Sequence, residues 1–268
     1  MLNNKKITTP LFGAVIGDVI GSAYEWDNVK TIDFKLFSKK SDFTDDTVLS
    51  IAIADCLLNN KNYAKTLFEY GRKYPHRGYG GMFNRWLESE NPQPYNSFGN
   101  GSAMRVSACG CLYDSLEETL NEAKRSSKPT HNHPEGIKGA QSVAASVFLA
   151  GKGNSKYDIK NYIENTFGYN LDRNIDEIRS DYRFDVTCQG TVPEAIIAFL
   201  ESSDFENAIR LAISIGGDSD KIAAITGSIS LAYYKHVPEK IGSKVWKKLP
   251  DEFKEIIIMF NNYEYITR

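Results

Sequence analysis

The chain has few of the residues that build disulfide frameworks or zinc sites. It contains four cysteines and four histidines in 268 residues. Cys109 and Cys111 flank a glycine, whereas Cys56 and Cys188 stand alone, so their spacing matches neither a metal-ligand nor a disulfide pattern. We therefore expect reduced thiols in a cytoplasmic protein.

Long apolar runs and a strong net charge are also missing. The apolar segment 11–23 is interrupted by Asp18 and several glycines, which is typical of neither a signal peptide nor a membrane span. The formal net charge of -2 gives no general attraction to nucleic acid or to an anionic membrane. With 41% hydrophobic and 25% charged residues, the composition is that of an ordinary globular protein and marks no domain boundary. We expect one domain over residues 1–268, acting as a monomer.

Two acidic motifs stand near opposite ends of the chain. The first is TDDT at 44–47, and the second is GGDSD at 216–220. Each opens an apolar, helix-like run, so both should lie at helix N-termini inside the fold. Crowded carboxylates repel each other unless a cation binds between them, and oxygen ligands suit Mg2+ or Mn2+ rather than Zn2+. Helix capping explains either motif alone, but the two together favour a metal centre.

Helical patterns dominate the rest of the sequence. Residues that favour helix capping precede three helix-like segments: Asp45 before 47–58, Ser115 before 116–124, and Ser155 before 157–167. Thr9 followed by Pro10 marks another helix start. Further helices are expected at 136–150, 193–200, 205–214, 222–234 and 252–260. Few segments alternate apolar and polar residues as a half-buried strand should, so the expected fold class is all-α.

Glycines are concentrated in a helical stripe and in two loops. Gly13, Gly17 and Gly21 recur every fourth residue, which predicts close packing against another backbone. The loops are RGYGG at 77–81 and SFGNG at 97–101, each leading into a helical stretch. Their backbone amides are suited to cradling a phosphate, although an ordinary tight turn explains either loop taken alone.

With these loops and both acidic motifs in order, the chain resembles the ADP-ribosylglycohydrolase family, which includes the dinitrogenase reductase-activating glycohydrolases. The likeness rests on GAVIGDVIGSAYE (13–25), FTDDT (43–47), HRGYG (76–80), SFGNGSAMR (97–105), THNHPEGIKGAQ (130–141) and GGDSD (216–220). The resemblance implies a single compact all-α domain with two Mg2+ or Mn2+ ions at the base of an ADP-ribose cleft.

The resemblance also implies roles for individual residues. The ligands of one metal match Thr44, Asp45, Asp46 and Asp220, and those of the other match Glu25, Asp218 and Asp220. The loop that holds the adenosine and distal ribose matches Ser97, Phe98, Gly99 and Asn100, with the ring of Phe98 stacking on adenine. The diphosphate loop matches Gly78, Tyr79 and Gly80, and the histidine beside the phosphates and ribose matches His131. His133 has no assigned role.

The activity implied is hydrolysis of the N- or O-glycosidic bond between ADP-ribose and a modified side chain. Glu25 and Asp46 are the candidates for acid/base work, with Asp45 as a third. The expected partners are ADP-ribose and an ADP-ribosylated protein or small molecule, with arginine or another guanidino group favoured. Serine linkages and ADP-ribosylated nucleic-acid ends remain open. The segment 169–186 is either a loop over the cleft or a solvated connection.

One residue departs from the family pattern. The second acidic motif is usually followed by threonine, whose hydroxyl completes one metal shell, but here Lys221 follows it. Its ammonium either replaces the second cation by pairing with Asp218 or Glu25, or reaches solvent while a water replaces the lost ligand. One or two metal ions are therefore expected.

Three functions remain open at this point. The favoured one is an active hydrolase with a weakened or absent second metal, because all the matched carboxylates are present. The second is a non-catalytic ADP-ribose-binding protein, which the lysine keeps open. The third is a metal-stabilised helical interaction protein that binds no nucleotide.

Overall fold

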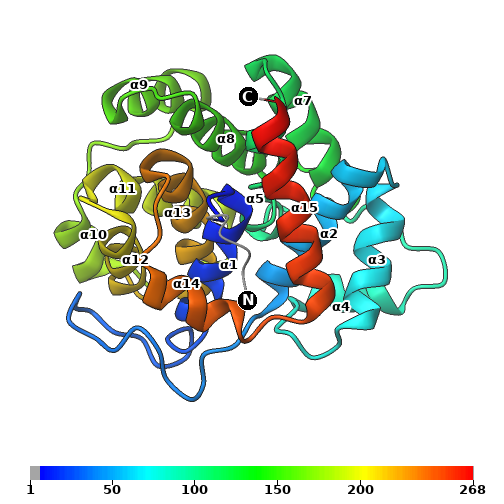
Figure 1. Cartoon of the computed structure of the whole chain (residues 1–268), viewed down its shortest axis with the longest axis horizontal. Coiled ribbons are helices and arrows are strands. Elements are labelled where there is room, and N and C mark those ends of the chain that lie inside the picture. The colour runs from blue at the N-terminus through cyan, green and yellow to red at the C-terminus, as the bar shows by residue number, and fades with distance from the viewer. Residues whose placement is uncertain (1–6, 268) are drawn as a thin grey trace.

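Helices make up the regular structure of the computed structural model, which describes residues 7–267 (Figure 1). They are α1 (Pro10–Gly21), α2 (Asp45–Asn59), α3 (Tyr63–Lys73), α4 (Gly81–Glu88), α5 (Gly101–Met104), α6 (Cys109–Leu112), α7 (Leu116–Ser127), α8 (Pro134–Gly151), α9 (Lys156–Phe167), α10 (Ile175–Asp181), α11 (Cys188–Glu201), α12 (Phe205–Ser214), α13 (Ser219–Tyr234), α14 (Glu239–Trp246) and α15 (Asp251–Thr267). Within the described range no strand forms, and one isolated bridge joins Gly99 to Thr187. The predicted all-α class is confirmed.

Side-chain caps set where many of these helices begin. Ser115 accepts a hydrogen bond from the amide of Glu118, and Ser155 forms a reciprocal capping box with Asp158, so α7 and α9 start where the sequence predicts. The prediction that Asp45 caps its helix was wrong. Thr44 is the cap, because its hydroxyl accepts from the amide of Asp46, and both aspartates then lie in the first turn of α2.

The predicted start of another helix was also wrong. Helix α11 begins at Cys188 rather than at 193, because the hydroxyl of Thr187 caps it and Pro193 is accommodated inside the helix. The segment 169–186 contains α10, where Asn174 forms a capping box and Ile175 and Ile178 are buried. Its last residues include Phe184 and Val186, which line the cavity described below, so the alternative of a loop over the cleft is supported.

Helices α1 and α13 pack side by side at the centre of the molecule (Figure 1). The glycine stripe of α1 faces α13, and no side chain fits between the two backbones. A Cβ atom on Gly13 would lie 2.3 Å from the carbonyl oxygen of Gly227, and one on Gly17 would lie 2.0 Å from that of Ala223. The close packing predicted from the stripe is confirmed, and it brings the end of α1 at Gly21 against Asp220.

The remaining helices surround this central pair. Helices α8, α11 and α12 pack on α13, and α2 packs on α1. The long α15 crosses over α2 near the C-terminus (Figure 1). In the described part of the chain, no helix is both long and apolar enough to cross a membrane. The N-termini of α2 and α13 converge beside the end of α1, which brings the two acidic motifs together.

Candidate active site

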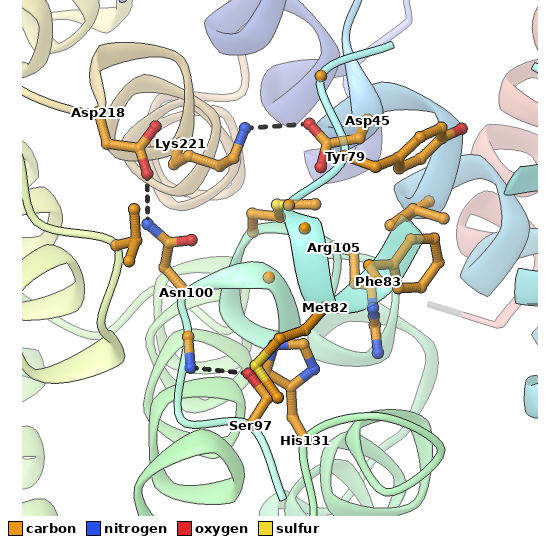
Figure 2. A pocket seen from close by; sticks show the side chains of 18 of the residues that line it. Asp45, Tyr79, Met82, Phe83, Ser97, Asn100, Arg105, His131, Asp218 and Lys221 are labelled. Atoms are coloured by element: carbon orange, nitrogen blue, oxygen red, sulfur yellow. Dashed lines mark hydrogen bonds and ion pairs between the residues drawn. The ribbon is translucent and has the colours of Figure 1, made fainter. Parts of the chain in front are cut away.

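A cavity of about 480 Å3 opens above the two acidic motifs (Figure 2). Segments far apart in the chain contribute to its lining, among them Glu25, Asp45, Gly78, Tyr79, Gly80, Ser97, Gly99, Asn100, Arg105, His131, Asp218 and Lys221. Its volume lies in the range of sites that hold small molecules.

Six carboxylates gather at the base of the cavity and are called the carboxylate cluster below: Asp18, Glu25, Asp45, Asp46, Asp218 and Asp220. All the aspartates among them are buried, and Glu25 is half-buried. Asp45 and Asp46 lie in the first turn of α2, and Asp220 lies in the first turn of α13. Both helix N-termini favour negative charge there.

The ammonium of Lys221 lies inside the carboxylate cluster. Its Nζ is 3.0 Å from Oδ1 of Asp45, 2.7 Å from Oδ2 of Asp46 and 3.1 Å from Oδ2 of Asp220 (Figure 2 draws the first of these). Lys221 is 8% exposed, so the alternative in which it reaches solvent was wrong. Pairing with Asp218 or Glu25 was the wrong choice of partner, because Nζ turns toward α2 instead.

Burial and neighbouring charges shift the pKa values of Lys221 and of the carboxylates around it. Burial favours neutral lysine, but the charges of Asp220, Asp45 and Asp46 outweigh it and hold the pKa of Lys221 well above its usual value. Burial likewise raises the pKa of Asp46 well above its usual value, against the attraction of Lys221. Oδ1 of Asp46 has no hydrogen-bond partner.

Asp18 is a member of the cluster that sequence reasoning missed. Its Oδ2 accepts the amides of Thr44 at 2.9 Å and Thr47 at 3.1 Å, and both threonine hydroxyls also donate to its carboxylate. Burial, followed by the charge of Asp220, raises the pKa of Asp18 to about 7. The available signal was its position, since it is the single charged residue in the apolar segment 11–23.

Two sets of carboxylates have the spacing that a metal ion requires. Oxygens of Glu25, Asp218 and Asp220 lie within 4.8 Å of one another, and so do those of Asp18, Asp46 and Asp220. The first set has no contact to Lys221 except through Asp220, and its oxygens fit one hard divalent cation. In the second set, both Asp46 and Asp220 accept a hydrogen bond from the ammonium of Lys221. A metal ion held by this set would lie next to the ammonium, so the set does not fit a metal ion.

Glu25 differs from the other members of the cluster. It lines the cavity just beyond the end of α1 and is only half-buried. Burial, with the charge of Asp220 as the next cause, raises the pKa of Glu25 to about 7. A carboxyl group of this kind can release or accept a proton near neutral pH.

The SFGNG loop is tied to the second acidic motif. The side-chain amide of Asn100 donates to Oδ2 of Asp218 at 2.7 Å (Figure 2). It also donates to the hydroxyl of Thr191 at 3.0 Å. The hydroxyl of Ser97 accepts the amide of Gly99 at 3.1 Å. These bonds hold the loop against the cavity and beside Asp218.

Phe98 lies apart from its neighbours in this loop. It is 47% exposed and does not line the cavity, whereas the residues on both sides of it do. Its ring centroid is 5.3 Å from that of His133. His133 also caps α8, with Nδ1 accepting the amide of Glu135 at 3.1 Å, so its visible role is structural.

The RGYGG loop crosses the opposite side of the cavity. Gly78 has φ of 89°, a conformation that favours glycine. The carbonyl of Arg77 accepts the amide of Asp45 at 2.7 Å, which fixes the loop beside α2. Around Gly80 and Gly81 a Cβ atom would meet nothing within 4 Å, so their backbone faces open space at the start of α4.

A buried arginine and a buried histidine form the wall below the loops (Figure 2). Arg105 is 1% exposed. Its guanidinium donates from Nη2 to the hydroxyl of Thr130 at 2.8 Å, and its Nε has no hydrogen-bond partner among the described residues. Burial lowers the pKa of Arg105 to about 10. Its positive charge faces the cavity with no paired carboxylate, which suits an anionic ligand.

His131 is buried beside Arg105. Its Nδ1 lies 2.7 Å from the hydroxyl of Thr130, which also accepts a hydrogen bond from Arg105. Burial, then the charge of Arg105, lowers the pKa of His131 well below its usual value. Gly101 keeps the ring accessible, because a Cβ there would lie 3.2 Å from Nε2.

An aromatic pair stands at the rim. Trp26, next to Glu25, is 82% exposed, and Phe184 is 44% exposed. Their rings stack with centroids 5.3 Å apart and planes 19° apart, and both residues line the cavity.

Known proteins share the sequence pattern and the fold of this chain. The family model described as ADP-ribosylglycohydrolase matches residues 3–262. The chain belongs to the ADP-ribosylglycohydrolase family. Its similarity to individual members is distant.

Several ADP-ribosylglycohydrolase relatives match most of the chain. ADP-ribosylhydrolase ARH3 of Homo sapiens is 25% identical over 93% of this chain and 90% of its own. The Mus musculus protein of the same name is 24% identical over 93% and 88%. ADP-ribosylarginine hydrolase Tri1 of Pseudomonas putida (strain GB-1) is 27% identical over 84% of this chain and 69% of its own. A solved structure titled "ADP-ribosylglycohydrolase-related protein complex" shares the fold, with a TM-score of 0.73, 21% identity and 97% coverage of both chains.

The residues matched to the ADP-ribosylglycohydrolase motifs occupy two layers. Those that line the cavity are Glu25, Gly78, Tyr79, Gly80, Asp45, Ser97, Gly99, Asn100, His131 and Asp218. Thr44, Asp46 and Asp220 lie beneath them and contact Lys221 or one another. Phe98 is exposed and does not line the cavity. The residues that sequence reasoning gave no site role are Asp18, Arg105, Trp26 and Phe184.

Proposed function

We propose that the protein hydrolyses the glycosidic bond that joins ADP-ribose to a modified side chain, with arginine or another guanidino group favoured. The observation that carries this proposal is that one cavity has an acidic part and a separate part suited to anions. Glu25 and Asp218 line one part of it, and Arg105 with the RGYGG loop lines another. The first suits a ribose centre that reacts with water, and the second suits a diphosphate.

The binding half of the proposal rests on donors that face the cavity. The guanidinium of Arg105, which has no paired carboxylate, and Nε2 of His131 lie in the cavity wall and would contact phosphate oxygens. The open backbone of Gly80 and Gly81 lies at the start of α4, where amides favour anions. The adenine would then extend toward the rim, where Phe98 has an exposed ring for stacking.

Glu25 is the best candidate for proton transfer. Asp45 and Asp46 both accept hydrogen bonds from Lys221, and Asp46 lies beneath the cavity lining, which favours Glu25 over them. In the proposed reaction the bond from the anomeric carbon to the side-chain nitrogen breaks, and a water oxygen replaces the nitrogen. The leaving nitrogen takes a proton from Glu25, which regains one from the water.

A divalent metal belongs to this proposal. Glu25, Asp218 and Asp220 are the residues that would hold it, and Mg2+ or Mn2+ is the ion that their oxygens suit. When bound, such an ion supplies a Lewis acid that polarises ribose oxygens and lowers the pKa of water. Glu25 has two carboxylate oxygens, so one can contact the ion while the other handles the proton.

The preference for a guanidino acceptor rests on the two aromatic rings at the rim of the cavity. The stacked rings of Trp26 and Phe184 present aromatic faces beside Glu25, and a planar guanidinium is attracted to such faces. The name of the Pseudomonas putida relative, ADP-ribosylarginine hydrolase, points to the same linkage. The cytoplasmic location and the monomeric state stay predictions.

The test is ADP-ribose release from arginine-linked and serine-linked peptides. Wild-type protein should favour the arginine linkage, and Glu25→Gln should slow release about 100-fold or more, because its amide cannot exchange a proton. Trp26→Ala should raise KM for the arginine peptide alone by about 2- to 30-fold. Tyr157→Ala, an exposed aromatic on α9 away from the cavity, is the matched control. Equal loss on both peptides would contradict the rim argument.

A second candidate is a non-catalytic ADP-ribose-binding protein. The observation that favours it is Lys221, whose ammonium occupies three carboxylates that the family uses for metal. This candidate predicts tight calorimetric binding of ADP-ribose and no release from any linkage, with or without metal.

A further inference from the structure

Lys221 lies among carboxylates that favour a cation, but its position in a helix is unfavourable for a positive charge. It is the third residue of α13, inside the first turn, where the helix dipole disfavours positive charge. It is also buried rather than extended to solvent. Something in its surroundings must therefore stabilise the ammonium strongly.

That stabilisation comes from a complete set of acceptors. An ammonium group has three protons, and Nζ has three carboxylate oxygens within hydrogen-bond distance, one each from Asp45, Asp46 and Asp220. These acceptors come from two helices. Asp45 and Asp46 lie 176 and 175 residues away from Lys221 in the sequence. The lysine is built into the site with its hydrogen-bonding capacity filled.

The same carboxylates are those matched to one metal ion of the family. Of the matched residues Thr44, Asp45, Asp46 and Asp220, the three aspartates all bond the ammonium. A protonated lysine cannot ligate a metal, and a divalent ion among these oxygens would face the ammonium directly. This half of a two-metal site does not fit a metal while the lysine is in place.

The other half of the site remains suited to a cation. Lys221 donates to neither Glu25 nor Asp218, and their oxygens lie within 4.8 Å of each other and of Asp220. Asn100 fills only one oxygen of Asp218. The alternative trio of Asp18, Asp46 and Asp220 is less suited, because the carboxylate of Asp18 already accepts from two amides and two hydroxyls.

We propose that the Lys221 ammonium is a tethered replacement for one of the two metal ions, so that the protein binds a single divalent cation between Glu25, Asp218 and Asp220. Its catalytic consequence rests on the function proposed above, because the lysine would supply fixed positive charge at the base of the ribose site. The metal count itself does not depend on that function.

The experiment is a metal count on the full-length protein without substrate. Wild type, loaded with Mn2+ and freed of excess, should contain one Mn2+ per chain by mass spectrometry and show an electron paramagnetic resonance spectrum of isolated ions. Lys221→Thr should contain two, with spectral broadening from a neighbouring pair. Lys247→Thr, an exposed lysine at the end of α14, should match wild type.

The outcomes separate this inference from the proposed function. Two Mn2+ ions in wild type, none in wild type, or no gain in folded Lys221→Thr would each overturn it. If Lys221→Thr does not fold, the wild-type count and spectrum still decide. One ion without ADP-ribose release would contradict only the proposed function, and two ions with release would contradict only the tethered cation.

Discussion

Replacing Gly17 with alanine tests the contact that assembles the site. Gly17 is in the middle of α1, and its backbone meets that of α13 directly. An added Cβ would lie 2.0 Å from the carbonyl oxygen of Ala223 and 2.6 Å from the amide nitrogen of Ala224. Both are backbone atoms, so no side chain can rotate away to make room.

The expected loss of stability is large. Helices α1 and α13 must move apart by about 1 Å to relieve the contact between the new Cβ and the oxygen of Ala223. This movement weakens the packing of the helix pair with the most extensive contact among the described residues. Overpacking a core costs about 1–3 kcal/mol even where side chains can adjust. Because backbone cannot adjust here, we expect about 3 kcal/mol or more, which corresponds to a Tm lower by roughly 6–12 °C for a chain of this length.

The assay is urea unfolding followed by circular dichroism, in chelator so that metal binding does not contribute. Gly242→Ala in α14 is the matched control, because its Cβ would meet Val237 and Phe12 at ordinary distances of 3.6 and 3.7 Å. That change should stabilise the protein by roughly 0.5–1 kcal/mol through the unfolded state. The reasoning is refuted if the two alanine variants change stability by the same amount.

Two further predictions concern the walls of the cavity. Asn100→Ala removes the hydrogen bond to Asp218 and should weaken Mn2+ binding about 10- to 100-fold in a calorimetric titration, whereas unchanged affinity would show that Asn100 does not position the carboxylate. His131 has a folded-state pKa below its unfolded value, so the unfolded chain takes up the proton first and stability is lost as pH falls below about 6.5. Between pH 6.5 and 5.5, urea unfolding should show wild type losing up to about 1.4 kcal/mol more than His131→Gln, and parallel pH profiles would contradict a buried neutral histidine.

The sequence predicted those features that depend on local chemistry. The all-α class, the close packing along Gly13, Gly17 and Gly21, and the position of both acidic motifs at helix N-termini follow from residue spacing alone. Helix α3 was missed although Asn62 caps it by accepting the amide of Lys65, so a usable signal was present. Boundaries failed where two capping residues competed, as Thr44 and Asp45 do.

The remaining features depend on distances between segments far apart in the chain. The presence of Lys221 was visible in the sequence, but its choice of Asp45 and Asp46 over Glu25 depends on how α13 faces α2. Similarly, nothing in the sequence near Arg105 indicates that its guanidinium lacks an acidic partner. Such relations require the packed helices.

The most direct test of the hydrolase proposal is release of free ADP-ribose from an arginine-ADP-ribosylated protein, with Mg2+, with Mn2+ and with chelator. ADP-ribose binding is measured alongside by calorimetry. We predict release that requires a divalent cation and stops in chelator. Binding of ADP-ribose without release under any of these conditions, and on serine-linked substrate as well, would contradict the hydrolase and favour the binding protein.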